Sequence, residues 1–242
     1  MQDYGPETYG DRIAPLYDEL YERELDTDAA VDALARLAGP GPVLELAIGT
    51  GRLAVPLAKR GIDISGIDAS EAMVARMRAK PGGEEIPVTM GDFADVGVDG
   101  SFRLVYVAFN TIFALLTQDD QVRCFRNVAA RLADGGRFVV EAFVPDLTRW
   151  DRGQRVSAPS VRLDRIELEA SRHDPVNQRV DSQHVFVTDG KTQLYPVSLR
   201  YAFPSELDLM ARLAGLELVD RWGGWRGEPF TNASKDHVSV YG

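Results

Sequence analysis

The stretch Val43-Leu44-Glu45-Leu46-Ala47-Ile48-Gly49-Thr50-Gly51-Arg52-Leu53 is an apolar run that ends in an acid and a glycine-rich turn, and a helical pattern follows it. Gly49 and Gly51 allow a tight turn and leave backbone N–H groups uncovered at the start of that helix, where a nucleoside-type ligand can lie. Glycine pairs after apolar runs are also common in ordinary turns, so the surrounding sequence has to decide between the two interpretations.

Beyond this turn, apolar strands alternate with amphipathic helices. We expect strands at 43–47, 62–67, 86–90, 102–109 and 137–143, and helices at 52–60, 70–79 and 119–132. This order predicts an α/β fold with a parallel, doubly wound sheet that is covered by helices on both faces. Gly135-Gly136 is typical of a helix C-terminus. The segments 216–222 and 237–241 predict a closing antiparallel strand pair.

The 242 residues are predicted to form a single domain with three parts. Residues 1–42 form a helical lid, and residues 43–145 and 203–242 form the ligand-binding core. Between the core segments, residues 146–202 are a β-rich insertion. Its alternating apolar stretches predict an antiparallel meander, and they run over 161–173, 179–188 and 194–201.

Composition limits the partners and the compartment. The formal net charge of −10 argues against a nucleic-acid partner, because such binding draws on Lys and Arg that neutralise phosphates. A small molecule is the expected substrate. The single cysteine, Cys124, cannot form an internal disulfide, and we find neither a targeting pattern nor an apolar run of membrane-spanning length. We therefore expect a cytoplasmic protein with no membrane partner, and a homodimer stays open.

Acidic and amide side chains follow successive predicted strands. Glu45, Asp68, Asp92 and Asn110 end the first four strands, and Phe93 comes next to Asp92. The carboxyl ends of parallel strands meet at one crevice, so these side chains are expected to converge. A carboxylate at Asp68 can accept both hydroxyls of a ribose, and Asp92 can accept the amino group of adenine while Phe93 covers its face. Together they predict a nucleoside pocket.

A dinucleotide site is the competing interpretation. The run from Gly49 to Ala54 also fits the pattern G-x-G-x-x-A, and Asp68 lies near the spacing of a ribose-binding acid. Glu45 lies where it would repel a pyrophosphate, and it suits a cationic ligand end such as the ammonium of an amino-acid tail. A nicotinamide-dependent oxidoreductase is therefore kept as an alternative.

Residues 30–145 and 216–242 resemble the class I S-adenosylmethionine-dependent methyltransferases. Glu45 to Gly51 resembles the family's first motif, with Ala47 where its first glycine often stands, and 132–136 resembles the turn before its fifth strand. The resemblance implies a Rossmann-like seven-stranded sheet with an antiparallel last strand, and S-adenosyl-L-methionine as cofactor. The implied cofactor-binding residues are Tyr9, Glu45, Ala47, Gly49, Gly51, Arg52, Asp68, Ala69, Asp92, Phe93, Phe109 and Asn110.

Within the family, the chain is similar to actinobacterial small-molecule enzymes, including N-methyltransferases of amino sugars in antibiotic pathways. Tyr9, Tyr17-Asp18, the strand end at 109–112 and the β-rich insertion carry this similarity. Ala114 stands where the sugar enzymes place a histidine. We predict methyl transfer to a nitrogen or oxygen of a small, specialised metabolite, with a non-catalytic cofactor-binding scaffold as a further alternative.

Positioning is expected to dominate catalysis, with a base only where the acceptor must lose a proton. The predicted catalytic residues are His237, His184, Glu141 and Tyr17. His237 begins the last strand and can project toward the substrate mouth, whereas His173 lies in a turn and is expected to be exposed. The lid is expected to hold two helices over 7–38 that break near Pro15. No metal-binding pattern is present, so we predict no metal.

Overall fold

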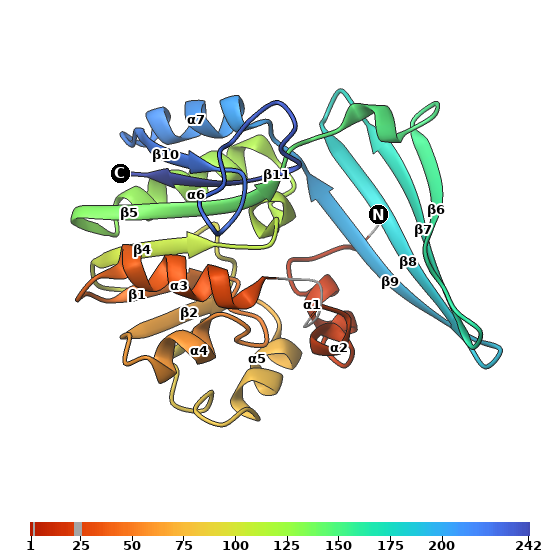
Figure 1. The fold of residues 1–242 in the computed structure, drawn as a ribbon, viewed down its shortest axis with the longest axis horizontal. Coiled ribbons are helices and arrows are strands. Elements are labelled where there is room, and N and C mark those ends of the chain that lie inside the picture. The colour runs from red at the N-terminus through yellow and green to blue at the C-terminus, as the bar shows by residue number, and fades with distance from the viewer. Residues whose placement is uncertain (2, 22–25) are drawn as a thin grey trace.

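The computed structural model describes residues 1, 3–21 and 26–242 (Figure 1). Its core is a seven-stranded sheet with the strand order β10-β11-β5-β4-β1-β2-β3, in which β11 runs antiparallel to β5 and to β10. The predicted α/β fold class, with an antiparallel last strand, is confirmed. The strands are β1 (Val43–Leu46), β2 (Ile64–Asp68), β3 (Val88–Met90), β4 (Phe102–Val107), β5 (Leu132–Phe143), β10 (Leu218–Trp222) and β11 (Asp236–Tyr241).

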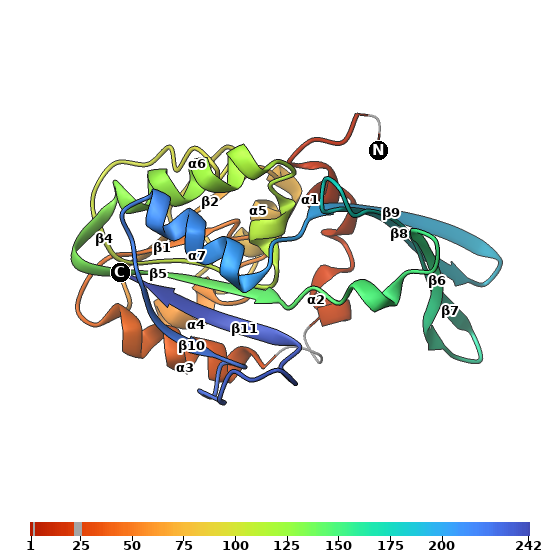
Figure 2. The same cartoon turned by 90° about the horizontal axis from the view of Figure 1, so that it is seen from above.

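Helices cover both faces of this sheet (Figure 2). On β4, Leu104 faces the cluster that contains α3 and α4, whereas Val105 faces the cluster that contains α6 and α7. The alternation follows from the period of two in a strand, and both faces must therefore be apolar. The helices are α1 (Thr8–Ile13), α2 (Tyr17–Tyr21), α3 (Thr27–Ala38), α4 (Ala54–Lys59), α5 (Glu71–Arg78), α6 (Gln118–Ala129) and α7 (Pro204–Leu213).

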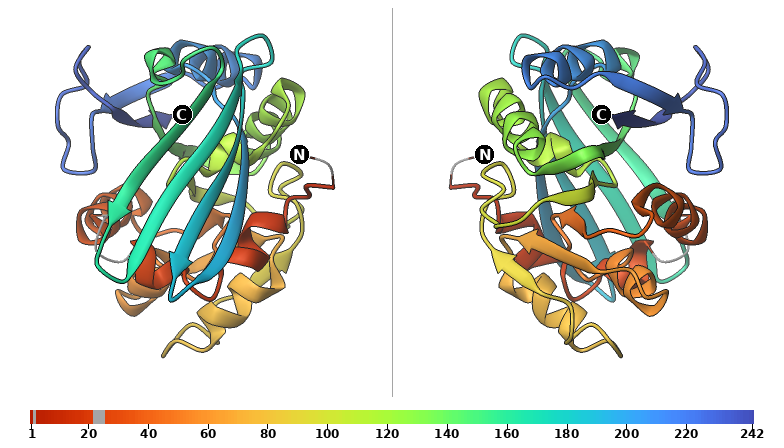
Figure 3. Two further views of the ribbon diagram at one scale, coloured as in Figure 1. Left: turned by 90° about the vertical axis from the view of Figure 1, so that its right-hand side faces the viewer. Right: turned by 90° about the vertical axis from the view of Figure 1, so that its left-hand side faces the viewer.

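A second, antiparallel sheet is inserted between β5 and α7. It has four strands in the order β6-β7-β8-β9, and Figure 3 shows them running across one end of the molecule. Helices α1 and α2 lie between this sheet and the core (Figure 1). The strands are β6 (Gln154–Val161), β7 (Arg165–Asp174), β8 (Arg179–Thr188) and β9 (Lys191–Arg200).

A buried polar cluster joins the second sheet to the core. The Arg200 guanidinium, at the end of β9, donates to Gln121 Oε1 at 2.6 Å, to Gln178 Oε1 at 2.8 Å and to Glu206 Oε1 at 2.7 Å. Gln121 lies on α6 and Glu206 on α7, so one side chain ties the sheet to two core helices. A buried guanidinium requires such partners, because an unpaired buried charge is strongly unfavourable.

The structure differs from the predicted secondary structure in three places. The meander has four strands, because β6 also pairs with β7, with a register shift between Ser157 and Ser160. Over residues 1, 3–21 and 26–42, the lid region holds three helices, and α3 packs against the core sheet. Gly135-Gly136 lies inside β5 and not at the end of α6. Gly135 has a φ of +69°, and a register shift beside it allows pairing with β4 to begin at Leu132.

No helix within the described residues is long and apolar enough to cross a membrane.

Candidate functional site

A cavity of about 430 Å³ opens at the carboxyl ends of β1, β2 and β4 and extends to the second sheet. Eleven of the twelve residues predicted to bind the cofactor line it, and Gly51 is the exception. The lining residues can be divided into two groups, which we call the cofactor half and the acceptor half. The cofactor half comprises Glu45, Ala47, Ile48, Gly49, Thr50, Arg52, Leu53, Asp68, Ala69, Ser70, Met73, Asp92, Phe93, Phe109 and Asn110.

The glycine turn is held by Asp68. The backbone N–H of Gly49 donates to Asp68 Oδ2 at 2.7 Å, and that of Ser70 donates to Asp68 Oδ1 at 2.8 Å. Gly49 and Gly51 have φ angles of +59° and +71°, which favour glycine. A Cβ at Gly51 would lie 2.5 Å from Met77 Cγ, so Gly51 is required for packing against α5 and not for lining the cavity.

Glu45 lies at the end of β1 and is 5% exposed. Among the described residues, none gives its Oε2 a hydrogen bond, although the Tyr106 hydroxyl, the Arg52 guanidinium and the Ala54 N–H lie near the carboxyl group and favour its charged form. Burial raises the pKa of Glu45 to about 8. A buried carboxylate oxygen that lines a cavity without a donor is a site for a cationic group. It fits the ammonium of a methionine tail.

Arg52 and Asp92 complete the polar groups of the cofactor half. Arg52 donates to Thr27 Oγ1 at 3.0 Å, and its guanidinium carbon lies 5.9 Å from the centre of the Phe109 ring. Asp92, which follows β3, accepts the N–H of Ala94 at 2.9 Å. The half therefore carries carboxylates near its two ends and one guanidinium beside Glu45, a donor and acceptor set that suits a nucleoside joined to an amino acid.

The acceptor half comes from the N-terminal region, the segment after β4, the end of β5 and two strands of the second sheet. Aromatic contacts join its N-terminal part to the cofactor half, because Tyr21 packs on Tyr17 and on Phe109 with ring centres 4.9 Å apart in both cases. The hydroxyls of Tyr9 and Tyr21 are 3.2 Å apart. The acceptor half comprises Tyr4, Gly5, Pro6, Tyr9, Gly10, Tyr17, Tyr21, Ala108, Thr111, Ala114, Leu115, Leu116, Asp120, Phe143, His184, Val197, Ser198 and Leu199.

The two short N-terminal helices are bonded to the strand ends below them. Thr50 Oγ1 donates to Asp18 Oδ1 at 2.6 Å, and Ser70 Oγ donates to Asp11 Oδ1 at 2.6 Å. These bonds hold α1 and α2 over the cavity, where Tyr17 is half-buried and its pKa is raised by desolvation. Residues 22–25, which fall within the predicted lid, lie outside the described residues.

Of the predicted histidines, only His184 reaches the cavity. It lies on β8, its side chain is 26% exposed, and its Nδ1 is 3.7 Å from Glu167 Oε1. His173 lines neither half. Its prediction as an exposed turn residue is wrong, because its ring stacks on Trp150 with centres 4.3 Å apart and its Nε2 lies 3.0 Å from the Tyr201 hydroxyl.

His237 is fully buried and does not line the cavity. His237 pairs with Ala142 near the carboxyl end of β5, but the strand alternation of β11 places its side chain with Ser239 and Tyr241, on the face toward α7. Its Nδ1 is 2.8 Å from Ser239 Oγ, and burial lowers its pKa to about 4. The expectation that His237 projects toward the substrate mouth is therefore contradicted.

Glu141 also lies outside the cavity lining. Its Oε2 accepts the backbone N–H of Phe109 at 2.7 Å, and its Oε1 accepts the Trp225 indole N–H at 2.6 Å. Both oxygens are thus engaged with protein donors, and the predicted contact with a substrate amine is not supported by this geometry. The hydrogen bond between Glu141 and Trp225 could not be predicted from the sequence, because 84 residues separate the partners.

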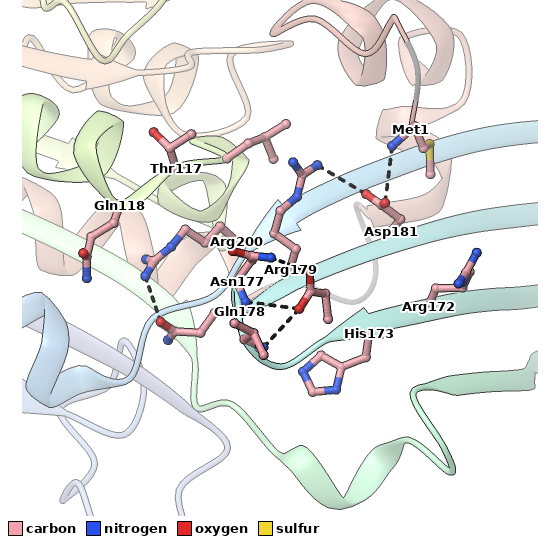
Figure 4. Close-up of a pocket in the computed structure, with 13 residues that line it drawn as sticks. Met1, Thr117, Gln118, Arg172, His173, Asn177, Gln178, Arg179, Asp181 and Arg200 are labelled. Carbon is pink, nitrogen blue, oxygen red and sulfur yellow. Dashed lines mark hydrogen bonds and ion pairs between the residues drawn. The ribbon is translucent and has the colours of Figure 1, made fainter.

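A second, polar cavity of about 720 Å³ lies at the junction of the second sheet and the start of α6 (Figure 4). Arg172, Arg179 and Asp181 line it, and Leu116 lines both cavities. None of the predicted catalytic or cofactor-binding residues does. Within the part of the chain that the structure describes, no three His, Cys, Asp or Glu side chains gather as metal ligands, and the absence of a metal stays a prediction.

Comparisons with known proteins agree with this geometry. Residues 43–136 match a family described as a methyltransferase domain. The CcbJ methyltransferase from Streptomyces caelestis is 40% identical, with a TM-score of 0.91 over 98% of each chain. The cypemycin N-terminal methyltransferase of a Streptomyces species is 29% identical over 201 residues, which are 82% of this chain and 81% of that protein.

The fold is also that of CalS10, an amino pentose methyltransferase from Micromonospora echinaspora whose structure contains bound S-adenosylmethionine. That structure is 21% identical, with a TM-score of 0.69 over 93% of this chain and 96% of that one. The match to the methyltransferase domain covers the glycine turn and the first strand ends, and the likeness to CcbJ covers nearly the whole chain. The chain belongs to the class I S-adenosylmethionine-dependent methyltransferases.

Proposed function

We propose that this enzyme transfers the methyl group to a nitrogen or oxygen of a small specialised metabolite, and that the acceptor half of the cavity binds that metabolite. One observation carries the proposal: a single cavity joins the family's cofactor-binding strand ends to an aromatic enclosure that holds one histidine. Its volume of about 430 Å³ lies in the range of small-molecule sites.

The charged residues of the cofactor half, the glycine turn and Phe93 have proposed roles. The orphaned oxygen of Glu45 and the glycine turn fit the methionine moiety, with Arg52 near its carboxylate. Asp68 binds the ribose hydroxyls, and Asp92 with Phe93 binds the adenine. Carboxylate oxygens can accept more than one hydrogen bond, so the backbone N–H bonds of Asp68 leave it able to accept hydroxyls.

The acceptor half favours an amine. Tyrosine faces attract cationic groups, and four tyrosines from the N-terminal region line this half. The cypemycin enzyme, by its name, methylates an N-terminus, which supports nitrogen as the acceptor atom. Actinobacterial neighbours such as the amino pentose enzyme support a metabolite acceptor.

Catalysis then depends on alignment and on the fate of one proton. The bound cofactor supplies an activated methyl group. Tyr9, Tyr17 and Phe109 enclose the acceptor and exclude water, and well-oriented geometry can lower a barrier by about 7–11 kcal/mol. His184 accepts the proton that the acceptor releases, and Glu167 beside its Nδ1 orients the ring.

Family membership decides against the nicotinamide alternative. A scaffold that needs a partner would bind S-adenosylhomocysteine but give no product alone. The test is to incubate the purified chain with methyl-labelled S-adenosylmethionine and a panel of amines, amino acids, amino sugars and phenols, and to locate the label by mass spectrometry. We expect a product labelled on nitrogen or oxygen. A label on carbon, or no product from any acceptor, would contradict the proposal.

The same assay tests His184. His184→Ala should lower kcat by about 100-fold or more and leave S-adenosylhomocysteine affinity unchanged. His173→Gln is the matched control, because His173 lies in the same sheet but outside the cavity, and it should keep full activity. Equal activity of the two variants would remove His184 from the mechanism.

A further inference from the structure

The loop after β4 adopts a backbone conformation that side chains usually avoid. Phe109 and Asn110 have φ angles of +54° and +63°, although neither is glycine. Each such residue costs on the order of 1–3 kcal/mol and persists only where its surroundings hold it. Both residues line the cavity, and the Phe109 ring contacts Tyr21 from the lid. The loop thus lies where the two halves of the cavity meet.

The hydrogen bonds that hold this loop come from β5. The Glu141 carboxylate accepts the Phe109 N–H at 2.7 Å, and the Glu141 backbone carbonyl accepts the Asn110 N–H at 3.1 Å. Asn110 Oδ1 in turn accepts the N–H of Phe143 at 2.6 Å. Consecutive left-handed residues turn their N–H groups away from the sheet ladder, so these partners replace the ladder bonds.

A single side chain from the C-terminal part of the chain completes the arrangement. Trp225, between β10 and β11, is 8% exposed and donates its indole N–H to Glu141 Oε1 at 2.6 Å. The half-buried carboxylate is thereby bonded on both oxygens, which offsets its partial loss of water contacts. The next residue, Arg226, bonds to Asp26 at the start of α3, so the loop is itself fixed at two points. Trp225 does not line the cavity.

We propose that Glu141 and Trp225 are positioning residues for methyl transfer: together they hold Phe109 and Asn110 in the left-handed conformation that shapes the cavity. Neither touches the cavity itself, so they act through Phe109 and Asn110. This inference rests on the assignment of the cavity as the methyltransferase site. It gives Glu141 a different role from the proton acceptor or amine ligand that its sequence position predicted.

Two substitutions and their combination test the pair. In Glu141→Gln, one oxygen is replaced by an NH2 group, which must face either the Phe109 N–H or the Trp225 indole N–H. Two N–H donors then face each other, and neither finds an acceptor there. In Trp225→Phe, one oxygen of the half-buried Glu141 carboxylate loses its donor. In the double variant, the glutamine oxygen can accept from Phe109 while its NH2 group faces a ring that has no donor.

The measurements require no acceptor. Hydrogen exchange of the peptide that contains Phe109 and Asn110 reports on the loop, and calorimetry with S-adenosylhomocysteine reports on the cofactor half. For Glu141→Gln we expect faster exchange in this peptide and an affinity loss of about tenfold or more, as for a lost bond to a charged group. Trp225→Phe should have a smaller effect in the same direction. The double variant should bind more tightly than Glu141→Gln alone.

The matched control is Trp222→Phe, because Trp222 donates its indole N–H to Asp220 at the surface. It should change neither exchange at Phe109 nor affinity. Wild-type exchange and affinity in Glu141→Gln would overturn the proposal, and additive losses in the double variant would overturn the role of Trp225. If Glu141→Gln does not fold, Trp225→Phe compared with Trp222→Phe decides in the same way. Failure to find an acceptor affects none of these measurements.

Discussion

The two halves of the cavity are built in different ways. The cofactor half is formed by strand ends of one sheet, and its side chains follow the strands at regular points along the chain from Glu45 to Asn110. The acceptor half brings together the N-terminal helices, the segment after β4 and two strands of a second sheet. One half depends on a sheet common to the family, and the other depends on contacts between distant segments.

The two halves of the cavity differ in how they are stabilised as well as in which segments form them. Apolar packing on both sheet faces supports the cofactor half. The second sheet contributes fewer apolar residues to the core, such as Val180 and Leu199, and is also joined to it through the polar Arg200 cluster. Polar clusters that are fully bonded specify one arrangement, but the loss of a single member leaves the others unpaired. We therefore expect the acceptor half to depend on a few side chains.

The largest effect is expected from Arg200→Met. It leaves Glu206 and Gln121 without their buried partner and should lower the free energy of unfolding by about 3–5 kcal/mol, measured by urea denaturation. Arg179→Met is the control, since Arg179 is part-exposed and lies 3.5 Å from Asp181, and it should cost about 1 kcal/mol or less. Equal losses would show that the cluster does not hold the second sheet.

The next-largest effect concerns the buried His237 and the loss of stability at acidic pH. His237 has a pKa of about 4 in the folded chain, below the ordinary value of 6.5, because burial disfavours its charged form. The unfolded chain therefore binds a proton first as the pH falls. The stability that neutral His237 provides is fully present above pH 6.5 and is lost as the pH falls toward 4, by about 3 kcal/mol. Unfolding measured across this range should show a shallower loss in His237→Asn, and identical profiles would contradict this account.

Two substitutions separate the strand ends within the cofactor half. Asp68→Ala removes a ribose acceptor and also leaves the N–H groups of Gly49 and Ser70 without a partner. It should weaken S-adenosylhomocysteine binding by about 100-fold. Asp92→Ala, which frees the Ala94 N–H and removes a 4.0 Å ion pair with Arg123 at the surface, should weaken it by about tenfold. Calorimetry on folded variants measures both, and unchanged affinity would remove that residue's role.

The smallest effect concerns Glu45. Its pKa of about 8 means that it is largely protonated at pH 7, whereas an ammonium partner requires the carboxylate. Ligand binding should therefore release a proton, and affinity for S-adenosylhomocysteine should rise by up to about tenfold for each pH unit up to 8. Titrations in buffers of different ionisation enthalpy detect the proton. Glu45→Gln should bind more weakly and lose this dependence, and a pH-independent affinity of the wild type would argue against an ammonium at Glu45.

The convergence of the strand-end acids on one cavity could be predicted from the sequence, for a physical reason. The period of the strands and the common edge of a parallel sheet together bring Glu45, Asp68 and Asp92 to one place, whatever lies elsewhere. Gly51 shows the limit of that reasoning, because its lack of a side chain serves packing against Met77 and not the cavity.

The acceptor half was much less predictable. The sequence does not show which face of the sheet the side chains of β11 occupy, because that depends on the position of α7. The predicted place of His237 at the substrate mouth is wrong for this reason. The partners of Glu141 come from Phe109 and Trp225, and no local pattern relates them. The sequence does not distinguish His184 from the other two histidines. His184 reaches the cavity only because the second sheet lies against the N-terminal helices.

The insertion of the second sheet between β5 and α7 keeps its cavity-lining residues apart from the cofactor half along the polypeptide. On the proposed assignment of the acceptor half, these residues can change while the cofactor half stays as it is, provided that the Arg200 junction is kept. The proposal therefore predicts that exchange of this segment between related enzymes alters the acceptor, with Arg200, Gln121, Gln178 and Glu206 as the joint that a chimera must preserve.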